Sequence, residues 1–391
     1  MTNLPQGWEV KTLSEIGEII TGSTPSKSNV EFYRKDYPFF KPSDFEQGYF
    51  LENAGDNLSK LGFGKARQLP PKTILVVCIG SLGKVALTRV IGSCNQQINA
   101  IIPHKNIISE YIYYYCISSK FQSILFSKAP QTTLAIFNKT EFSKLEIIYP
   151  KDIKEQERIV GILDFAFSKI DENIKKAKEN LANIDELMQS ALQKAFNPLK
   201  DNAKENYKLP QFWEWKSLEE ISENISAGGD KPKNCTESKT AKNQIPVYAN
   251  GVNNNGLVGY TDKATIIKPS LTISARGTIG FVCIRKEPYF PIVRLISLIP
   301  CENILCLHYL YFCLNFFIAK GEGSSIPQLT IPKFKSLQIP LPPLKEQEQI
   351  AEHLDFVFEK AKALKELYTK ELKDYEELKQ SLLNKAFKGE L

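Results

Sequence analysis

The sequence predicts an α+β protein, with two mixed α/β domains in tandem and one long helix after each. Fifteen residues beginning at Ile153 return almost unchanged at Leu344, 191 residues later. Other pieces of the first half return in the same order in the second half. Strand-like runs and apolar helical stretches alternate before each copy, and an unbroken helical periodicity follows it.

The spacing of the repeated pieces separates a variable front from a constant back in each half. LPQGWEVKTLSEI at Leu4 returns as LPQFWEWKSLEEI 205 residues later, and GSLGKVAL at Gly80 returns as GTIGFVCI 197 residues later. From Ile153 onward the offset stays at 191. Insertions collect where loops vary, so a segment of constant length indicates a rigid element. We predict domains at 1–150 and 198–341 and helices at 151–197 and 342–391.

The front segments contain short apolar runs typical of strands and longer ones typical of buried helices. We expect strands at Thr73–Gly80 and Leu271–Gly277, each followed by a tight G-x-x-G turn and a second strand. Apolar helices are expected at 110–126 and 308–321. Each front is therefore predicted to be an α+β domain.

The back segments show apolar residues alternating three and four apart, which is the seam of a coiled coil. The first seam runs from Leu163 to Ala195; the second, from Val357 to Leu382, is less regular and includes Leu364 and Leu378. We predict an antiparallel coiled coil with pseudo-two-fold symmetry. The alternative is that each helix packs on its own domain.

Composition and charge limit the classes of function. The net charge is +6, and residues 1–150 carry 16 basic against 12 acidic side chains, while 206–343 carry 15 against 10. Two basic modules fit a polyanion contacted in two places, although such charges are also common on soluble domains. Neither a signal peptide nor a membrane-spanning run is apparent, so we expect a cytoplasmic protein. Eight cysteines without a C-x-x-C pair and three histidines predict reduced thiols and no metal site.

Motifs for chemistry on nucleic acids are missing from the sequence. It contains no G-x-x-x-x-G-K-[ST] phosphate loop, no [ND]-P-P-[FY] methyltransferase tetrapeptide and no P-D dipeptide of the common nuclease motif. The histidines have no partners at the spacings of catalytic or zinc motifs. We therefore predict a binding protein and no enzyme.

The order of these pieces resembles a known family. The chain contains twice, in the same order, the pieces LPxxWExxxLxEI, a variable region, P-x-x-x-(K)EQ-x-x-I-x-x-x-LD and a long helix. This arrangement is similar to the specificity subunit of type I restriction–modification systems. The resemblance covers Leu4 to Leu391. One departure is IIYPKD before the first helix, where the second copy has the more proline-rich IPLPP.

The resemblance implies a non-catalytic subunit that reads double-stranded DNA. Each front would be a target recognition domain for one half of a split sequence, and the helices would space the domains. Two modification (methyltransferase) subunits would dock on the chain, and two restriction (translocase/endonuclease) subunits would join for cleavage. S-adenosylmethionine, ATP and Mg would belong to those partners, and this chain would bind no cofactor. The residues that match the family's docking regions are Glu155, Gln156, Ile159, Leu163, Asp164, Glu346, Gln347, Ile350, Leu354 and Asp355.

Side-chain chemistry indicates candidate DNA contacts, because amides pair with adenine and guanidinium or ammonium groups pair with guanine and phosphate. In the first domain they are Ser23, Thr24, Lys27, Lys41, Ser43, Arg67, Gln68, Ser81, Lys84, Gln96 and Gln97. In the second they are Lys231, Lys233, Asn250, Asn253, Asn254, Asn255, Arg276 and Thr278. Turn chemistry is the alternative for the Asn run, and a simple hairpin is the alternative for both G-x-x-G turns.

The loops of the two domains differ at almost every residue, which predicts two different half-sites and an asymmetric target. A second class of function remains open at this point. The chain could be a helical-hairpin adaptor whose two domains bind protein or RNA.

Overall fold

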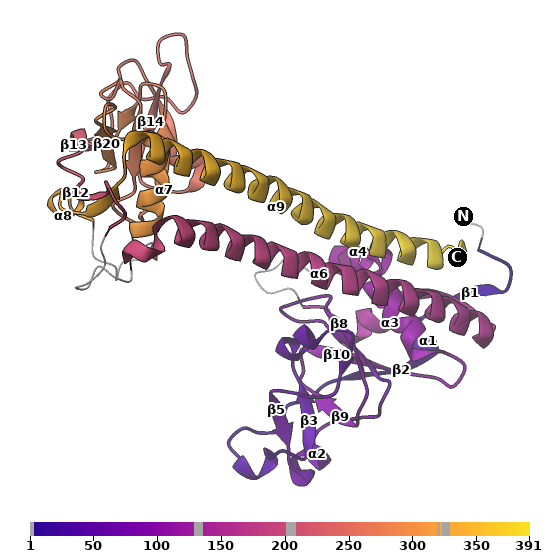
Figure 1. Ribbon diagram of the computed structural model, residues 1–391. Coiled ribbons are helices and arrows are strands. Elements are labelled where there is room, and N and C mark those ends of the chain that lie inside the picture. The colour runs from indigo at the N-terminus through magenta and orange to yellow at the C-terminus, as the bar shows by residue number, and fades with distance from the viewer. Residues whose placement is uncertain (1–3, 129–135, 201–208, 319–320, 323–328) are drawn as a thin grey trace. The chain divides into compact units, whose positions relative to one another are not determined.

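The computed structural model describes residues 4–128, 136–200, 209–318, 321–322 and 329–391 (Figure 1); for 197–200 and 321–322 it gives the backbone alone. The chain divides into two compact units, Met1–Ala177 with Thr369–Leu391 (unit 1) and Lys178–Tyr368 (unit 2). Each unit contains an α+β domain, part of helix α6 (Ile153–Lys200) and part of helix α9 (Leu344–Ala386). Two mixed domains and two long helices confirm the predicted fold class.

The domain of unit 1 is built on two sheets. One has the order β2-β10-β7-β8-β4, the other β5-β3-β9-β6, and β1 and β11 form a separate pair. The strands are β1 (Trp8–Thr12), β2 (Gly17–Thr21), β3 (Tyr37–Phe40), β4 (Phe50–Leu51), β5 (Asp56–Leu58), β6 (Gln68–Leu69), β7 (Ile74–Val77), β8 (Val85–Thr88), β9 (Gly92–Cys94), β10 (Ile98–Pro103) and β11 (Glu146–Pro150). The helices are α1 (Leu13–Ile16), α2 (Lys60–Lys65), α3 (Ser109–Ile117), α4 (Ser119–Lys128) and α5 (Lys139–Ser143), with 3-10 turns at Val30–Phe32 and Pro42–Gln47.

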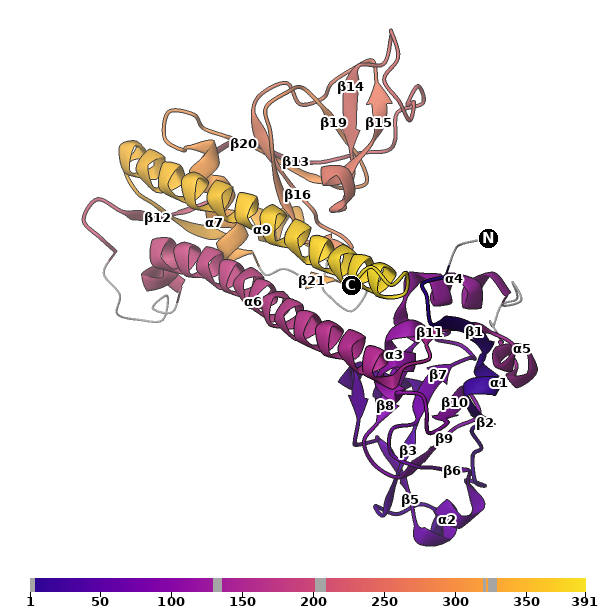
Figure 2. The same ribbon diagram turned by 90° about the vertical axis from the view of Figure 1, so that its right-hand side faces the viewer.

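The domain of unit 2 repeats this plan. Its sheets have the orders β13-β20-β16-β18 and β15-β14-β19, with short pairs β12-β22 and β17-β21. Figure 2 shows the second sheet beside the first. The strands are β12 (Glu214–Ser217), β13 (Ser222–Ala227), β14 (Ile245–Tyr248), β15 (Leu257–Thr261), β16 (Ser270–Ile273), β17 (Thr278–Ile279), β18 (Val282–Arg285), β19 (Phe290–Pro291), β20 (Ile296–Pro300), β21 (Gly321–Glu322) and β22 (Gln338–Leu341). The helices are α7 (Leu307–Phe317) and α8 (Ile331–Lys335), with a 3-10 turn, η3, at Asn253–Gly256.

The correspondence between the sheets extends to strand direction. The strands β2-β10-β7-β8 of unit 1 and β13-β20-β16-β18 of unit 2 pair antiparallel, and one parallel pair, β3·β9 or β14·β19, lies in the second sheet. Unit 1 adds a parallel edge pair, β4·β8, to its first sheet. The fully buried strands β7 (ILVV) and β16 (SLTI) occupy the same place in the two sheets. The duplication in the sequence is therefore a duplication of the fold.

One predicted helix is divided in two. The apolar stretch expected at 110–126 forms α3 and α4, because Ser118 takes an extended backbone (φ −67°, ψ 146°) between them. The Oγ of Ser118 donates to the carbonyl of Tyr115 (2.6 Å). Serine competes well for such local hydrogen bonds and so interrupts a helix that the apolar pattern alone would continue.

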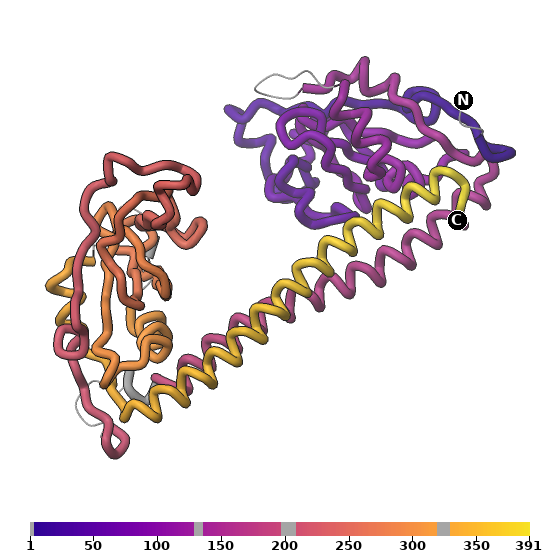
Figure 3. Tube along the Cα trace, turned by 90° about the horizontal axis from the view of Figure 1, so that it is seen from above, coloured from indigo at the N-terminus to yellow at the C-terminus, as the bar shows by residue number. Residues whose placement is uncertain are grey.

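The long helices run antiparallel within each unit (Figure 3). In unit 1, Arg158 near the start of α6 donates to the carbonyl of Leu391, and Asp171 accepts from Lys379 (2.6 Å). In unit 2, Asp185 pairs with Lys365. The seam residues of α6 are buried or half-buried.

Two seam positions predicted on α9 are wrong, since Leu364 and Leu378 are exposed. Lys365 and Lys379, one residue on, take the seam position instead. A lysine can cover apolar surface with its stem while its ammonium reaches an acidic residue. The Asp185 and Asp171 carboxylates on α6 provide that partner.

The end of each long helix packs on the domain that the other helix follows. In unit 1, Phe387 after α9 is buried against Tyr111 and Tyr115 of α3. In unit 2, Phe196 of α6 is buried against Tyr309 of α7. These phenylalanines end the repeated pieces ALQKAF and LLNKAF, 191 residues apart. Each core is therefore completed by a helix end from the other half of the sequence.

Candidate nucleic-acid interface

Most candidate DNA contacts of unit 1 lie on loops at one edge of its two sheets. The loop after β2 is held to the β9–β10 connection by hydrogen bonds from the Gly22 amide to Ile98 and from the Ser23 amide to Cys94 (both 3.0 Å). The β9–β10 loop is held in turn to the ends of β3 and β7, by Asn95 to Phe40 (3.1 Å) and by the Cys78 amide to Gln97 (2.7 Å). These backbone bonds give the loops a fixed geometry.

Several side chains on this edge are joined in pairs. Thr24 donates its hydroxyl to the amide oxygen of the exposed Gln96 (2.5 Å), which leaves the Gln96 NH₂ free to face a ligand. The Ser23 hydroxyl accepts from the Arg67 amide (3.2 Å), and the Arg67 side chain is exposed. Gln97 is held internally, because its amide oxygen accepts from Asn95 (2.7 Å) and its NH₂ donates to Ile79 (3.4 Å). Ser43, Gln68 and Ser81 are exposed as expected.

Two predicted cations of unit 1 already have acidic partners. Lys84 pairs with Glu46 (2.5 Å), and Lys41 pairs with Asp56. Burial lowers the pKa of Lys41, and the positive charge of Lys27 lowers it further. A DNA phosphate would have to compete with these carboxylates, so both lysines are weaker candidates than the sequence indicated.

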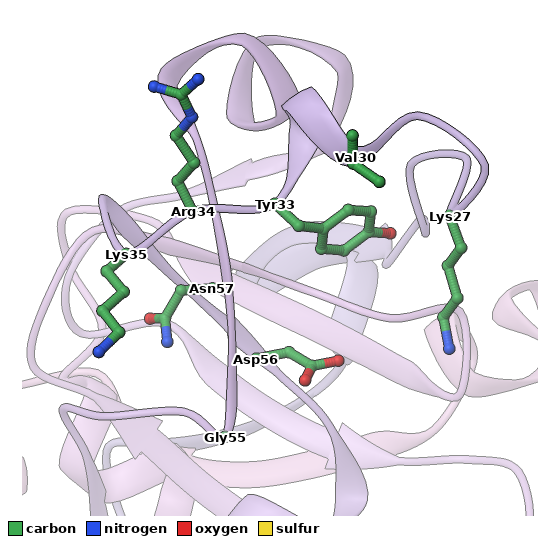
Figure 4. Close-up of a pocket in the computed structure, with 8 residues that line it drawn as sticks. All are labelled: Lys27, Val30, Tyr33, Arg34, Lys35, Gly55, Asp56 and Asn57. Carbon is green, nitrogen blue, oxygen red and sulfur yellow. The ribbon is translucent and has the colours of Figure 1, made fainter.

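A hollow of about 550 Å³ in unit 1 gathers three cations (Figure 4). Lys27 was predicted as a contact, whereas Arg34 and Lys35 on the same rim were missed. Tyr33 lies between the segments that carry them and donates its hydroxyl to Pro25 (2.6 Å). A signal for this site was present in the sequence as the basic pair of YRKDY immediately before β3. Cations that lie within about a Debye length of the DNA phosphates attract them, and this attraction does not depend on the base sequence.

In unit 2 the exposed Lys231 and Lys233 lie on the loop after β13, and the Asn run forms η3. Asn254 and Asn255 have left-handed backbones (φ 47° and 53°), so the turn explanation of the run is confirmed. Their side chains and that of Asn253 are exposed and remain candidate contacts.

Asn250 does not fit its predicted role as a direct contact. Its NH₂ donates to the Val293 carbonyl (2.6 Å), and its amide oxygen accepts from the Ala275 amide (2.8 Å). Both ends of the side chain are thus used within the domain. Asn250 therefore joins two loops of the same edge through its side chain.

Both G-x-x-G turns are hairpins, which was the alternative to a DNA contact at these turns. Gly80 and Gly83 have φ of 81° and 89°, and Gly277 and Gly280 have 69° and 80°. A side chain would be strained at such angles, which explains the repeated glycines. Arg276 is exposed beside the second turn, whereas the Thr278 hydroxyl in β17 is buried without a hydrogen-bond partner among the described residues.

The repeated KEQ phrase attaches each long helix to its own domain. The Gln156 amide oxygen accepts from Ile108 (2.9 Å), and its NH₂ donates to the carbonyls of Asn106 (3.3 Å) and Pro150 (2.9 Å). The contacts of Gln347 are the same ones in unit 2: its oxygen accepts from Cys306, and its NH₂ donates to Ile304 and Pro342 (2.9, 2.9 and 2.8 Å). Ile108 and Cys306 precede the first turns of α3 and α7. One side chain therefore joins three backbone segments.

The structure corrects half of the predicted docking residues. Gln156 and Gln347 are 0% exposed, and Ile159, Leu163 and Leu354 are buried in the two cores, so none of these can contact a partner subunit directly. Ile350 is half-buried. A spacing of three and four residues puts all of them on the helix face that the domain covers.

The charged residues of the phrase are more accessible. Glu155 forms two hydrogen bonds to Arg158 (both 2.7 Å), which lower the pKa of Glu155, and Glu346 accepts from the Trp213 indole (3.0 Å). Asp164 accepts from the Tyr114 hydroxyl (2.6 Å), and Asp355 lies 2.6 Å from Nδ1 of His308.

Exposed apolar side chains recur at matching positions of the two helices. Phe165 is 70% exposed and Phe356, 191 residues later, is 60% exposed. Leu187 and Leu378 form a second exposed pair with the same offset. Phe165 and Leu378 belong to unit 1, and Phe356 and Leu187 belong to unit 2. Each unit therefore presents one phenylalanine and one leucine whose equivalents in the other unit are also exposed.

Among the described residues no group of three or more His, Cys, Asp and Glu could hold a metal ion. The eight cysteines are free thiols. Within the described part of the chain, no helix is both long and apolar enough to cross a membrane.

Comparison with known proteins decides the family. The family model described as "Type I restriction modification DNA specificity domain" matches residues 5–183 and again 210–373. The chain belongs to this family. Each of the two matches begins in the front of one half and extends into the long helix behind it, as the internal repeat does.

Relatives within this specificity-domain family cover different shares of the chain. The HindI specificity subunit of Haemophilus influenzae is 39% identical over 176 residues, which is 44% of this chain and 38% of that protein. The MjaIX specificity subunit of Methanocaldococcus jannaschii is 24% identical over 392 residues, covering 91% of this chain and 88% of that protein.

Two solved structures share the specificity-domain fold over nearly the full length. A chain solved in work on complex assembly and conformational transition of the type I R-M system matches with a TM-score of 0.82 at 19% identity, covering 100% of both chains. The HsdS subunit of Thermoanaerobacter tengcongensis matches with a TM-score of 0.59 at 20% identity, covering 99% of this chain and 98% of that one.

Proposed function

We propose that this chain is the non-catalytic subunit that gives a type I restriction–modification complex its DNA sequence specificity. Each domain reads one half of an asymmetric, bipartite target in double-stranded DNA. The observation that carries the proposal is that one family model matches twice, and that each match contains a loop-bearing sheet edge rich in amides and cations. Such groups provide both phosphate attraction and base readout.

The long helices are assigned two tasks. As rigid elements of constant length they set the gap between the half-sites. They also dock two methyltransferase subunits, through Phe165 and Leu378 in unit 1 and through Phe356 and Leu187 in unit 2. The same exposed residues in both units suit two copies of one partner.

Catalysis is assigned to the partners. Methyl transfer from S-adenosylmethionine belongs to the two methyltransferase subunits, and ATP- and Mg-dependent translocation and cleavage belong to two restriction subunits. The complex is expected to act in the cytoplasm, where its DNA target would lie.

Electrophoretic mobility shifts with the purified complex of this chain and its methyltransferase subunits test the proposal. The probes are genomic duplex DNA fragments containing the cell's adenine-methylated motif, the same fragments with that motif scrambled, and single-stranded RNA of equal length. We expect tight binding to the motif and weak, salt-sensitive binding to the other two probes. Equal binding to all three, or a preference for RNA, would favour an adaptor function instead.

A further inference from the structure

The loop between β19 and β20 in unit 2 is equivalent to the β9–β10 loop of unit 1. The Asn95 amide donates to Phe40 at the end of β3 (3.1 Å), and the Ile292 amide donates to Tyr248 at the end of β14 (2.8 Å). Asn95 and Ile292 are 197 residues apart, the offset that also relates the two G-x-x-G turns. At this offset Gln97 corresponds to Arg294, a cation that the choice of contacts by residue type missed.

Arg294 is carried by a strained backbone. Val293 and Arg294 have φ of 54° and 58°, a region that non-glycine residues rarely adopt, least of all β-branched ones. Among the described residues of the two loops, these angles occur in the unit 2 loop alone. Such strain persists where the surroundings fix the conformation, and it is typical of functional positions.

Hydrogen bonds fix this conformation from two sides. The Val293 amide donates to Gly229, and the Arg294 amide donates to Gly228 (both 2.8 Å). The Val293 carbonyl accepts from Asn250, whose amide oxygen also accepts from Ala275, next to Arg276. A Cβ on Gly228 would lie 2.6 Å from the Ile292 nitrogen, so only glycine permits this close approach.

The side chains on the two equivalent loops differ in availability. In unit 1 the Gln97 amide is hydrogen-bonded on both sides within the domain. The Arg294 side chain is exposed, and the structure shows no partner for its guanidinium among the residues it describes. The Asn250 side chain links the backbones of Val293 and Ala275, the residues before Arg294 and Arg276.

We propose that Arg294 reads a guanine in the second half-site. This inference rests on the proposed DNA-reading function and names a specificity residue within it. A guanidinium fork pairs bidentately with O6 and N7 of guanine, and this pairing requires a fixed orientation. A phosphate contact requires no fixed orientation. The strained, hydrogen-bonded loop fixes the backbone that carries Arg294, which suits a base contact.

The test measures discrimination at each base pair, using the complex of the full chain with its methyltransferase subunits. Duplexes carry the cell's methylated motif or one substituted base pair in either half. For Arg294→Ala we expect a roughly ten- to hundredfold loss of discrimination at one guanine of the second half, with the first half read as before. Arg294→Lys should restore only part of it. Lys286→Ala is the matched control, an exposed cation that follows β18, and should leave every preference unchanged.

The outcomes separate this inference from the function on which it rests. If the wild-type complex shows no sequence preference, the proposed function fails. If the wild-type complex discriminates and Arg294→Ala weakens all duplexes equally, with a shallower salt dependence, Arg294 is a phosphate contact and the inference is overturned. Unchanged discrimination in both Arg294 variants, with thermal unfolding like that of the wild type, overturns it as well.

Discussion

Unit 1 and unit 2 attach their helices through the same contacts but build their loop edges differently. Gln156 and Gln347 make matching hydrogen bonds, and Phe387 and Phe196 close matching cores. At the sheet edge, unit 1 has a relaxed loop in which Gln97 is hydrogen-bonded within the domain, whereas unit 2 has a strained loop with an exposed Arg294. The difference teaches that the shared scaffold and the loop edge can vary separately within one fold, since the attachment contacts are repeated and the exposed loop side chains are not.

The largest effects are expected where a helix end completes a core. Phe387→Ala and Phe196→Ala should each lower the free energy of unfolding by about 3–5 kcal/mol, because each removes a buried aromatic ring. Urea denaturation of the isolated chain measures this. Phe165→Ala, at an exposed phenylalanine, should cost less than about 0.5 kcal/mol. A small effect in only one of the two buried variants would break the equivalence of the units.

Removing either buried glutamine should be the next most damaging change. Gln156→Ala and Gln347→Ala each leave a backbone N–H and two carbonyls without their partner, which should cost about 2–4 kcal/mol. The exposed neighbours Glu157 and Glu348 supply matched controls, and their alanine variants should cost less than about 1 kcal/mol. Glutamine variants as stable as these controls would show that the phrase does not hold helix to domain.

Serine at the exposed phenylalanines should affect assembly and spare folding. Phe165→Ser or Phe356→Ser should weaken the binding of one methyltransferase subunit about tenfold or more, and the double variant should weaken both. Native mass spectrometry counts the bound subunits. Leu367→Ser is the control, because Leu367 is 58% exposed but its counterpart 191 residues earlier is Lys176. Full occupancy in the double variant would move the docking surface elsewhere.

Glycine substitution at the two loops should have small effects of opposite sign. Val293→Gly relieves a left-handed backbone and should raise the free energy of unfolding by up to about 1 kcal/mol. Gln96→Gly in the relaxed loop should lower it by up to about 1 kcal/mol, through added chain entropy and loss of the hydrogen bond from Thr24. Thermal unfolding of both variants makes the comparison, and a destabilised Val293→Gly would argue against strain in this loop.

The fold could be predicted from repetition and periodicity, because both are properties of the chain alone. The break at Ser118 and the lysines in the α9 seam could not, since each depends on a local hydrogen bond or a partner across the helix pair. At the site, residue type predicted exposed candidates such as Gln96 and Arg276. Residue type could not show that the side-chain amides of Asn250 and Gln97 are hydrogen-bonded within their domains. Arg294 could have been found from the sequence, because the offset of 197 between the two G-x-x-G turns also relates it to Gln97.

The central claim is that two like units read two unlike half-sites. Single-molecule sequencing of genomic DNA, from cells with and without the gene for this chain, tests it most directly. The account predicts an adenine-methylated split motif with two different halves, which disappears when the gene is deleted and returns when it is restored. A motif that survives the deletion, or one whose halves are inverted copies of each other, would contradict it.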